Sequence, residues 1–179
     1  WEKNPISSDN GIASINALIK ETGVKVESVC ADYFMDIPYF TANETERKTL
    51  REKLVWLVFQ AKKIGVENID LPFVDASKVN HKDQFPLIKE FVSPALKSAE
   101  KTGITIALET NLNPPDFSEL LLYFDHPYLK ANYDTGNSSG IGYDCNKELS
   151  SYGNSIKTVH IKDRILNGGT KPLGTGSAN

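Results

Sequence analysis

The sequence has no apolar run that approaches the roughly 20 residues of a membrane-spanning helix and no block of basic residues. Its formal net charge is −3 over 179 residues, so it lacks the basic footprint that is typical of nucleic-acid binding. No signal-peptide pattern opens the chain. We therefore expect a small-molecule partner, with no nucleic acid and no membrane.

Cysteine is also scarce. Cys30 and Cys145 are the only two, too few for a disulfide framework. Free thiols are typical of a reducing compartment, so we expect a cytoplasmic protein. The chain begins with Trp1 rather than Met and ends in the polar, Gly-rich stretch "KPLGTGSAN". We interpret it as a piece of a larger protein.

What the chain does contain is a regular alternation of helical and strand patterns, with no internal repeat and no low-complexity linker. Hydrophobic residues make up 40% of the sequence, enough for a real core. We expect residues 1–179 to form one domain. The helical periods and the apolar–polar alternations predict helices at 7–23, 41–65, 83–103, 113–124 and 144–153, and strands at 24–34, 66–74, 104–110, 129–137 and 157–165.

Local signals support these boundaries. Gly23 and Gly103 stand where two helices should end, and Thr41 and Glu44 have the spacing of a capping box at the start of the second helix. No Asn-Gly pair or similar hairpin turn separates adjacent strands. Strands that alternate with helices in this way form parallel sheets with helical crossovers.

Two architectures fit that order, an open doubly wound sheet and a closed barrel. Central strands of a doubly wound sheet are apolar on both faces, and such folds for dinucleotides begin with a Gly-rich turn that this chain lacks. Each of the last three predicted strands has one polar face instead. That face is formed by Thr105, Ala107 and Glu109 in strand 104–110, by Asn132 and Asp134 in strand 129–137, and by Thr158, His160 and Lys162 in strand 157–165. We predict an α/β fold, a (β/α)8 TIM barrel that is incomplete in this chain, with about five βα units and the first strands and last strand missing.

Parallel barrels place their working groups at the carboxyl ends of the strands. At those ends the last three strands carry Glu109, Asp134 and His160. Each has a structural explanation when taken alone, as a helix cap, an Asx turn or a hydrogen-bonded histidine. Together they predict a site for one divalent metal ion, and their two oxygen donors and one nitrogen donor suit Mn²⁺, Co²⁺, Mg²⁺ or Zn²⁺.

Four short motifs follow one another in the second half of the chain, "IALET", "NYDTGNS", "VHIKDR" and "PLGTG". They resemble the sugar (phosphate) isomerase/epimerase family with the xylose-isomerase-like TIM barrel, where they match strands five to seven. The earlier part of the chain resembles that family only in its βα pattern. The resemblance implies that Trp1 and Glu2 are the tail of strand two and that strand eight follows Asn179.

The resemblance also implies roles for individual residues. Family members hold one divalent metal through Glu, Asp, His and a second Glu on strand eight, and the first three carry over to Glu109, Asp134 and His160. In the epimerases the two glutamates are the acid/base pair, so Glu109 is the catalytic candidate here. Asn137 stands where several members have a histidine that contacts substrate, and Lys162 lies on the face of His160, where it could hold a hydroxyl or phosphate.

The function that follows is a divalent-metal-dependent isomerase or epimerase that acts on a sugar or sugar phosphate through an ene-diolate. One alternative is a lyase or dehydratase on the same metal barrel, and another is a non-catalytic barrel that binds a small ligand. An apurinic-site endonuclease shares the fold, but its three-zinc site needs more histidines than the three present. Relatives are often dimers or tetramers, so a homo-oligomer is expected. The fragment alone should be inactive, with two exposed sheet edges.

Further polar residues have simpler interpretations. Asp32 and Asp70, on earlier strands, could line the pocket, but we expect them to cap helices or form turns. Asp163 should face away from the polar side and pair with Arg164. The stretch at 167–176 is interpreted as a flexible loop, because it lacks the spacing of a phosphate-binding motif.

Overall fold

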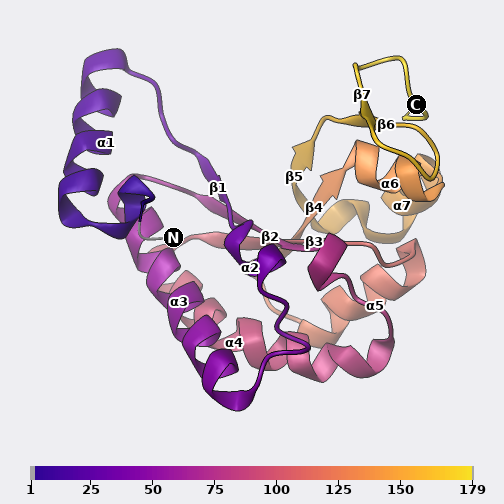
Figure 1. Ribbon diagram of the computed structural model, residues 1–179, viewed down its shortest axis with the longest axis horizontal. Helices are drawn as coiled ribbons and strands as arrows, with labels where there is room; N and C mark the ends of the chain where they lie inside the picture. Colours follow the sequence, from indigo (N-terminus) through magenta and orange to yellow (C-terminus); the bar gives the residue numbers. More distant parts are fainter. Residues whose placement is uncertain (1–2, 179) are drawn as a thin grey trace.

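The computed structural model describes residues 3–178, so the predicted strand tail at Trp1 and Glu2 lies outside the described residues. A five-stranded, fully parallel sheet runs through the molecule in the order β1-β2-β3-β4-β5 (Figure 1). Strands that follow one another across the sheet in the order of the chain, with no reversal of that order, form an arc of a barrel. The strands are β1 (Ser28–Cys30), β2 (Asn68–Phe73), β3 (Thr105–Thr110), β4 (Leu129–Asp134) and β5 (Ile156–His160).

Helices connect successive strands, as the predicted alternation requires. The α-helices are α1 (Asp9–Thr22), α2 (Tyr33–Asp36), α3 (Glu44–Lys63), α4 (Phe85–Thr102), α5 (Pro114–Phe124), α6 (Thr135–Ile141) and α7 (Cys145–Tyr152). Short 3-10 turns are η1 (Pro5–Ser7), η2 (Asp75–Ser77), η3 (Lys82–Gln84) and η4 (Gly153–Ser155). None of the helices within residues 3–178 combines the length and the apolar character needed to cross a bilayer.

Helix boundaries follow from the capping chemistry. Gly23 and Gly103 end α1 and α4 in the left-handed conformation, with φ of 71° and 75°. The capping box of α3 is formed by Asn43 and Glu46, whose side chains each accept from the other's backbone N–H. The predicted box at Thr41 and Glu44 is therefore wrong by two residues, since Asn is the stronger N-cap and lies next to the first helical turn.

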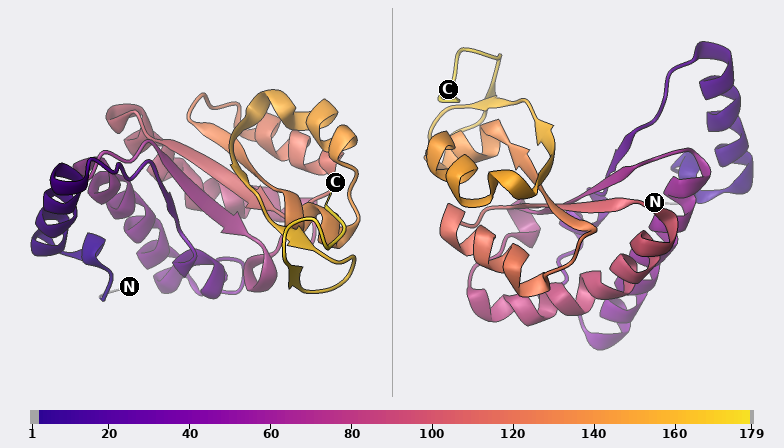
Figure 2. Two further views of the ribbon diagram at one scale, coloured as in Figure 1. Left: turned by 90° about the horizontal axis from the view of Figure 1, so that it is seen from above. Right: turned by 180° about the vertical axis from the view of Figure 1, so that it is seen from behind.

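The core lies between the sheet and the helices α3, α4 and α5, which cover one side of it (Figure 1). Alternation along the strands decides which side chains reach it. On β2, Ile69 and Leu71 are fully buried against these helices, and on β3 so are Ile106 and Leu108. The opposite face of the same strands carries the polar residues. Figure 2 shows that α1 and the α6–α7 region lie at opposite ends of the sheet.

The last strand departs from expectation. The alternation of apolar and polar residues in the last strand predicts that Val159 and Ile161 lie under helices, opposite His160, but they are 48% and 69% exposed. β5 is an edge strand of the sheet, and no helix within residues 3–178 follows it to cover its outer face. The apolar side chains that alternation assigns to the core therefore remain in solvent.

After β5 the chain forms a hairpin that was not expected, although its loop contains the turn signal Asn167-Gly168. β6 (Asp163–Arg164) pairs in antiparallel fashion with β7 (Thr170–Lys171). The carboxylate of Asp163 is buried and accepts hydrogen bonds from the backbone N–H of Gly174, Gly176 and Ala178, at 2.8 to 3.0 Å. The expected pairing of Asp163 with Arg164 is thus wrong, and the Gly-rich stretch folds back onto the carboxylate instead of forming a free loop.

Asp163 is expected to hold this stretch in place only while it is ionised. Hydrogen bonds from the backbone N–H of Ala178 and Gly176 lower its pKa, so its stabilising contribution is present above the ordinary carboxyl pKa of about 3.9 and is lost as pH falls through the lowered value. Gly174 and Gly176 donate to Oδ2 and Ala178 donates to Oδ1, and Asp163→Asn replaces one of these oxygens by an NH₂ group. We expect the amide protons that donate to the replaced oxygen to lose their downfield NMR shifts in Asp163→Asn at neutral pH, and in the wild type only under strong acid.

The matched control for that experiment is Asp36→Asn, which makes the same change at an exposed position. Its spectrum should keep all three shifts. Unchanged amide shifts in Asp163→Asn would contradict the prediction.

Candidate functional site

Three strand ends converge on the polar side of the sheet. Glu109 lies near the end of β3, while Asp134 and His160 end β4 and β5 and are direct partners in the register of that pair. One ligand atom from each of the three lies within 4.8 Å of the others. Within residues 3–178, no other group of three or more His, Cys, Asp or Glu side chains is close enough to share an ion. The three predicted metal ligands are therefore brought together.

Asp134 occupies its place because it starts a helix. Its Oδ1 accepts from the backbone N–H of Asn137 at 2.7 Å, so it is the N-cap of α6. The sequence interpretation extended the strand through Asn137 and missed α6. The capping bond turns the chain at Asp134 and directs its side chain to the polar side of the strand ends.

The other two predicted ligands are held by amide contacts. Asn132 Nδ2 donates to Glu109 Oε2 at 2.8 Å and lies 3.0 Å from His160 Nδ1. His160 Nδ1 is itself 3.3 Å from Glu109 Oε2. Glu109 and Asp134 are almost fully buried, while His160 is partly exposed. An ion or ligand would therefore approach from the side of His160.

The electrostatics of the site favour a cation. Burial raises the pKa of the Glu109 carboxyl, and the nearby carboxylate of Asp134 raises it further, while the amide of Asn137, His160 and the amide of Asn132 act in the opposite direction. Two ionised carboxylates that are buried beside each other repel, and a bound cation offsets this repulsion.

The two predicted substrate contacts lie in the same place. Asn137 Nδ2 donates to Glu109 Oε1, and Asn137 Oδ1 accepts from Lys162 Nζ at 3.2 Å and from Arg164 Nη1 at 3.0 Å. Lys162 Nζ is 3.7 Å from Asp134 Oδ2. All five predicted site residues are thus adjacent to one another, and Arg164 joins them.

Glycine at position 136 permits this closeness. A Cβ on Gly136 would lie 2.7 Å from Cγ of Lys162, well inside van der Waals contact. The first turn of α6 can therefore pack directly against Lys162 only because residue 136 has no side chain.

A buried acid that we expected to be a cap or turn residue rather than to line the pocket lies beside His160. Asp70 lies in the middle of β2, where it neither caps a helix nor forms a turn, and it is 3% exposed. Its Oδ2 is 3.7 Å from His160 Nε2. The alternation of polar Asn68 and Asp70 with apolar Ile69 and Leu71 is the signal that could have placed it on the polar side. Asp32 stands at the N-cap position of α2 but makes no capping hydrogen bond.

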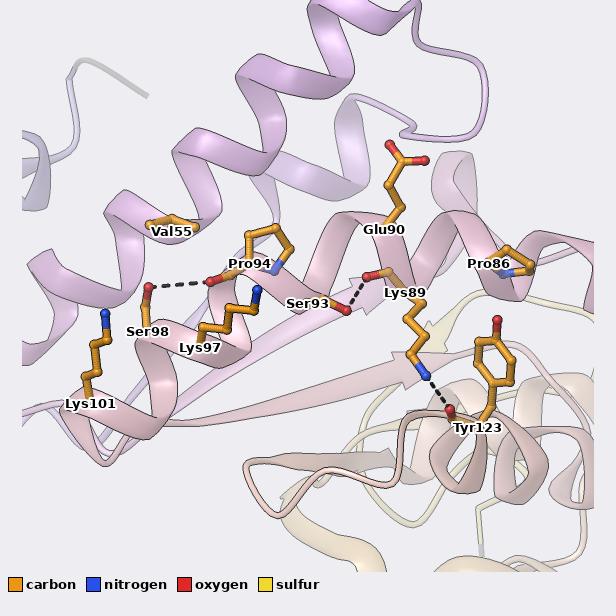
Figure 3. A pocket seen from close by; sticks show the side chains of 10 residues that line it. All are labelled: Val55, Pro86, Lys89, Glu90, Ser93, Pro94, Lys97, Ser98, Lys101 and Tyr123. Atoms are coloured by element: carbon orange, nitrogen blue, oxygen red, sulfur yellow. Dashed lines mark hydrogen bonds between the residues drawn. The ribbon is translucent and has the colours of Figure 1, made fainter.

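A cavity of about 460 Å³ adjoins the site and is lined in part by Asn137 and Arg164. A separate depression of about 600 Å³ lies on the outer helices α3, α4 and α5 (Figure 3). In that depression, Lys89 donates to the backbone oxygen of Tyr123, and none of the predicted site residues takes part. Of these two, the cavity beside Asn137 is the one that adjoins the site.

Comparisons with known proteins agree with this geometry. The family model described as "Xylose isomerase-like TIM barrel" matches residues 2–179. An L-ribulose-5-phosphate 3-epimerase, UlaE, from Escherichia coli O1:K1 is 26% identical over 164 residues, which cover 88% of this chain and 57% of the relative. The chain thus spans just over half the length of that curated relative.

Solved structures show the same fold. The D-allulose 3-epimerase from a Methylomonas species superposes with a TM-score of 0.75 at 16% identity, covering 98% of this chain and 63% of that one. A xylose isomerase-like TIM barrel protein from Mycobacterium smegmatis, in complex with magnesium, gives a TM-score of 0.70 at 18% identity, covering 95% and 64%. At these identities the likeness shows the fold alone.

Proposed function

Because the chain belongs to the xylose isomerase-like TIM barrel family, we propose that it is part of an isomerase or epimerase of a sugar or sugar phosphate. In this proposal the enzyme depends on a divalent metal and works through an ene-diolate. The observation that carries it is the convergence of Glu109, Asp134 and His160 at adjacent strand ends. The name of the matched relative, a 3-epimerase of a ketose phosphate, supports the substrate class.

The residues present fit a divalent ion. Two carboxylates and an imidazole offer one ligand atom each within 4.8 Å of one another. Burial and the nearby charge of Asp134 both raise the pKa of Glu109, and a bound cation would stabilise the ionised carboxylate. Glu109, Asp134 and His160 would hold it, and Mn²⁺, Co²⁺, Mg²⁺ and Zn²⁺ all accept such a set. When bound, the ion supplies Lewis-acid stabilisation of the negative charge that develops on the substrate oxygens.

Glu109 is proposed as the base. Its carboxylate takes the proton from the carbon beside the substrate carbonyl, and the electron pair left behind forms the ene-diolate. Return of a proton to the other face gives the epimer, and return to the neighbouring carbon gives the isomer. In the family this second step belongs to the glutamate of strand eight. General acid–base catalysis of this kind contributes roughly 10²–10⁴-fold.

Asn137 and Lys162 are proposed to orient the substrate. Asn137 can hydrogen-bond a hydroxyl or carbonyl oxygen but cannot exchange a proton near neutral pH, so its role is positional. The ammonium of Lys162, which is partly exposed beside Asp134, can hold a hydroxyl or a phosphate. We further propose a homo-oligomer, and a cytoplasmic location that agrees with the free thiols of Cys30 and Cys145.

Solvent exchange tests the function directly. The full-length enzyme, loaded with Mn²⁺, is incubated in D₂O with a panel of ketoses and their phosphates. We expect deuterium at the carbon next to the carbonyl of at least one sugar, and none after the metal is removed with EDTA. An elimination product would favour the lyase alternative. The absence of exchange across the whole panel, with metal bound, would contradict the proposal.

A further inference from the structure

A second polar group lies beside the three proposed ligands, on the same side of the sheet. It consists of Asn68, Asp70, Asn132 and Thr158, which we call the floor network. Asp70 pairs with Ala107 in the register of β2 and β3, and alternation places it on the same face as Glu109. The carboxylate of Asp70 is almost completely buried, so its hydrogen-bond partners determine what it can do.

The two oxygens of Asp70 face different groups. Oδ1 accepts from Asn68 Nδ2 at 2.7 Å and from the hydroxyl of Thr158 at 2.6 Å. Oδ2 faces Nε2 of His160 at 3.7 Å. This distance is too long for a hydrogen bond, but it is short enough for the carboxylate to favour a proton on Nε2. One oxygen is therefore anchored and the other acts on the imidazole.

The opposite nitrogen of His160 meets a donor. Nδ1 lies 3.0 Å from Asn132 Nδ2. The orientation of the Asn132 amide is set by Glu109, because the carboxylate oxygen Oε2 can only accept and Asn132 Nδ2 donates to it. Asn132 Oδ1 lies 3.0 Å from the hydroxyl of Thr158. Glu109 Oε2 also lies 3.3 Å from Nδ1, but the hydrogen-bond partner of Nδ1 is the Asn132 amide, which already donates to that oxygen. The donor at Nδ1 and the carboxylate charge at Nε2 together favour the neutral tautomer with its proton on Nε2.

We propose that Asp70 is a positioning residue that holds His160 in the Nε2–H tautomer. Nδ1 then carries no proton and lies 3.0 Å from Asn132 Nδ2 and 3.3 Å from Glu109 Oε2, where a cation that displaces the Asn132 contact could use its lone pair. The second part of this inference rests on the proposed function, whereas the tautomer itself does not. Metal-binding histidines are generally oriented by a carboxylate or carbonyl at their other nitrogen, and removal of that partner typically costs 10–100-fold in metal affinity.

The substitution Asp70→Asn keeps the size and shape of the side chain but replaces the acceptor that faces Nε2 of His160 by a donor. Because Asn68 and Thr158 both donate to the Oδ1 side, the new amide oxygen stays there and the NH₂ group points at His160. A donor now faces Nε2 and removes the preference for a proton there, so the share of the Nδ1–H tautomer rises even though Asn132 still faces Nδ1. We expect long-range ¹H–¹⁵N NMR spectra of the metal-free chain at pH 8 to show this tautomer change, and Mn²⁺ titration to show about 10–100-fold weaker binding.

Controls separate this role from general damage. Asp125→Asn makes the same substitution at the C-cap of α5, where the left-handed backbone accepts Asn, and should change neither the tautomer nor the affinity. His160→Gln identifies the imidazole signals. The wild-type spectrum is decisive even if Asp70→Asn does not fold, because an Nδ1–H tautomer of His160 in the wild type would overturn the inference.

The outcomes also distinguish the inference from the proposed function. If the wild type binds Mn²⁺ and Asp70→Asn keeps the same tautomer and affinity, the role of Asp70 is wrong and the metal site stands. If the tautomer changes as expected but the wild type binds no Mn²⁺, Asp70 orients His160 and the metal site in the proposed function is wrong.

Discussion

Replacement of Glu109 by Gln, or of His160 by Ala, is expected to remove divalent-metal binding. Glu109→Gln removes the negative charge. The side-chain amides of Asn132 and Asn137 each donate to one oxygen of Glu109, so the new NH₂ group faces one of these two donors. In the full-length enzyme, loss of the base should also lower turnover by roughly 10²–10⁴-fold. Metal content after dialysis and calorimetric titration with Mn²⁺ provide the measurements.

Exposed residues of the same type serve as controls. Glu67→Gln and His81→Ala alter side chains at the surface and should leave metal content unchanged. If the variants of Glu109 and His160 retain the metal content of the wild type, these residues are not the ligands and the site must be sought elsewhere.

Replacement of Phe91 by Ala should cause the largest loss of stability. Phe91 is 1% exposed and its ring stacks on Tyr39 at 4.6 Å between centroids, with Phe34 at 5.4 Å and Phe73 at 6.1 Å. It therefore joins α4 to α2, to β2 and to the segment before α3. Truncation leaves a cavity among rings that cannot collapse, and it should cost about 3–5 kcal/mol in the free energy of unfolding.

Urea denaturation followed by circular dichroism measures this loss. Phe59→Ala is the matched control, because Phe59 lies on α3 with 44% of its surface exposed and should change stability by only about 0.5 kcal/mol. A loss below about 1 kcal/mol for Phe91→Ala would show that the aromatic cluster repacks, contrary to the prediction.

The candidate site shows how far alternation alone can reach. A strand places successive side chains on opposite faces, so the sequence alone assigns Glu109, Asp134 and His160 to one polar face. Asp70 obeys the same rule and was still interpreted as a cap or turn residue. Only its contacts with Thr158 and His160, 88 and 90 positions away along the chain, identify it as part of the site.

By itself, the sequence determined the parallel sheet, the helices that cover one side of it and the face on which the polar residues lie. These features follow from periodicity and capping, which act over a few residues. The tertiary structure alone decided that Asp163 binds the folded-back Gly-rich stretch and that Val159 stays exposed. Both outcomes depend on whether another segment of the chain packs against the residue, and the local sequence pattern does not predict such contacts.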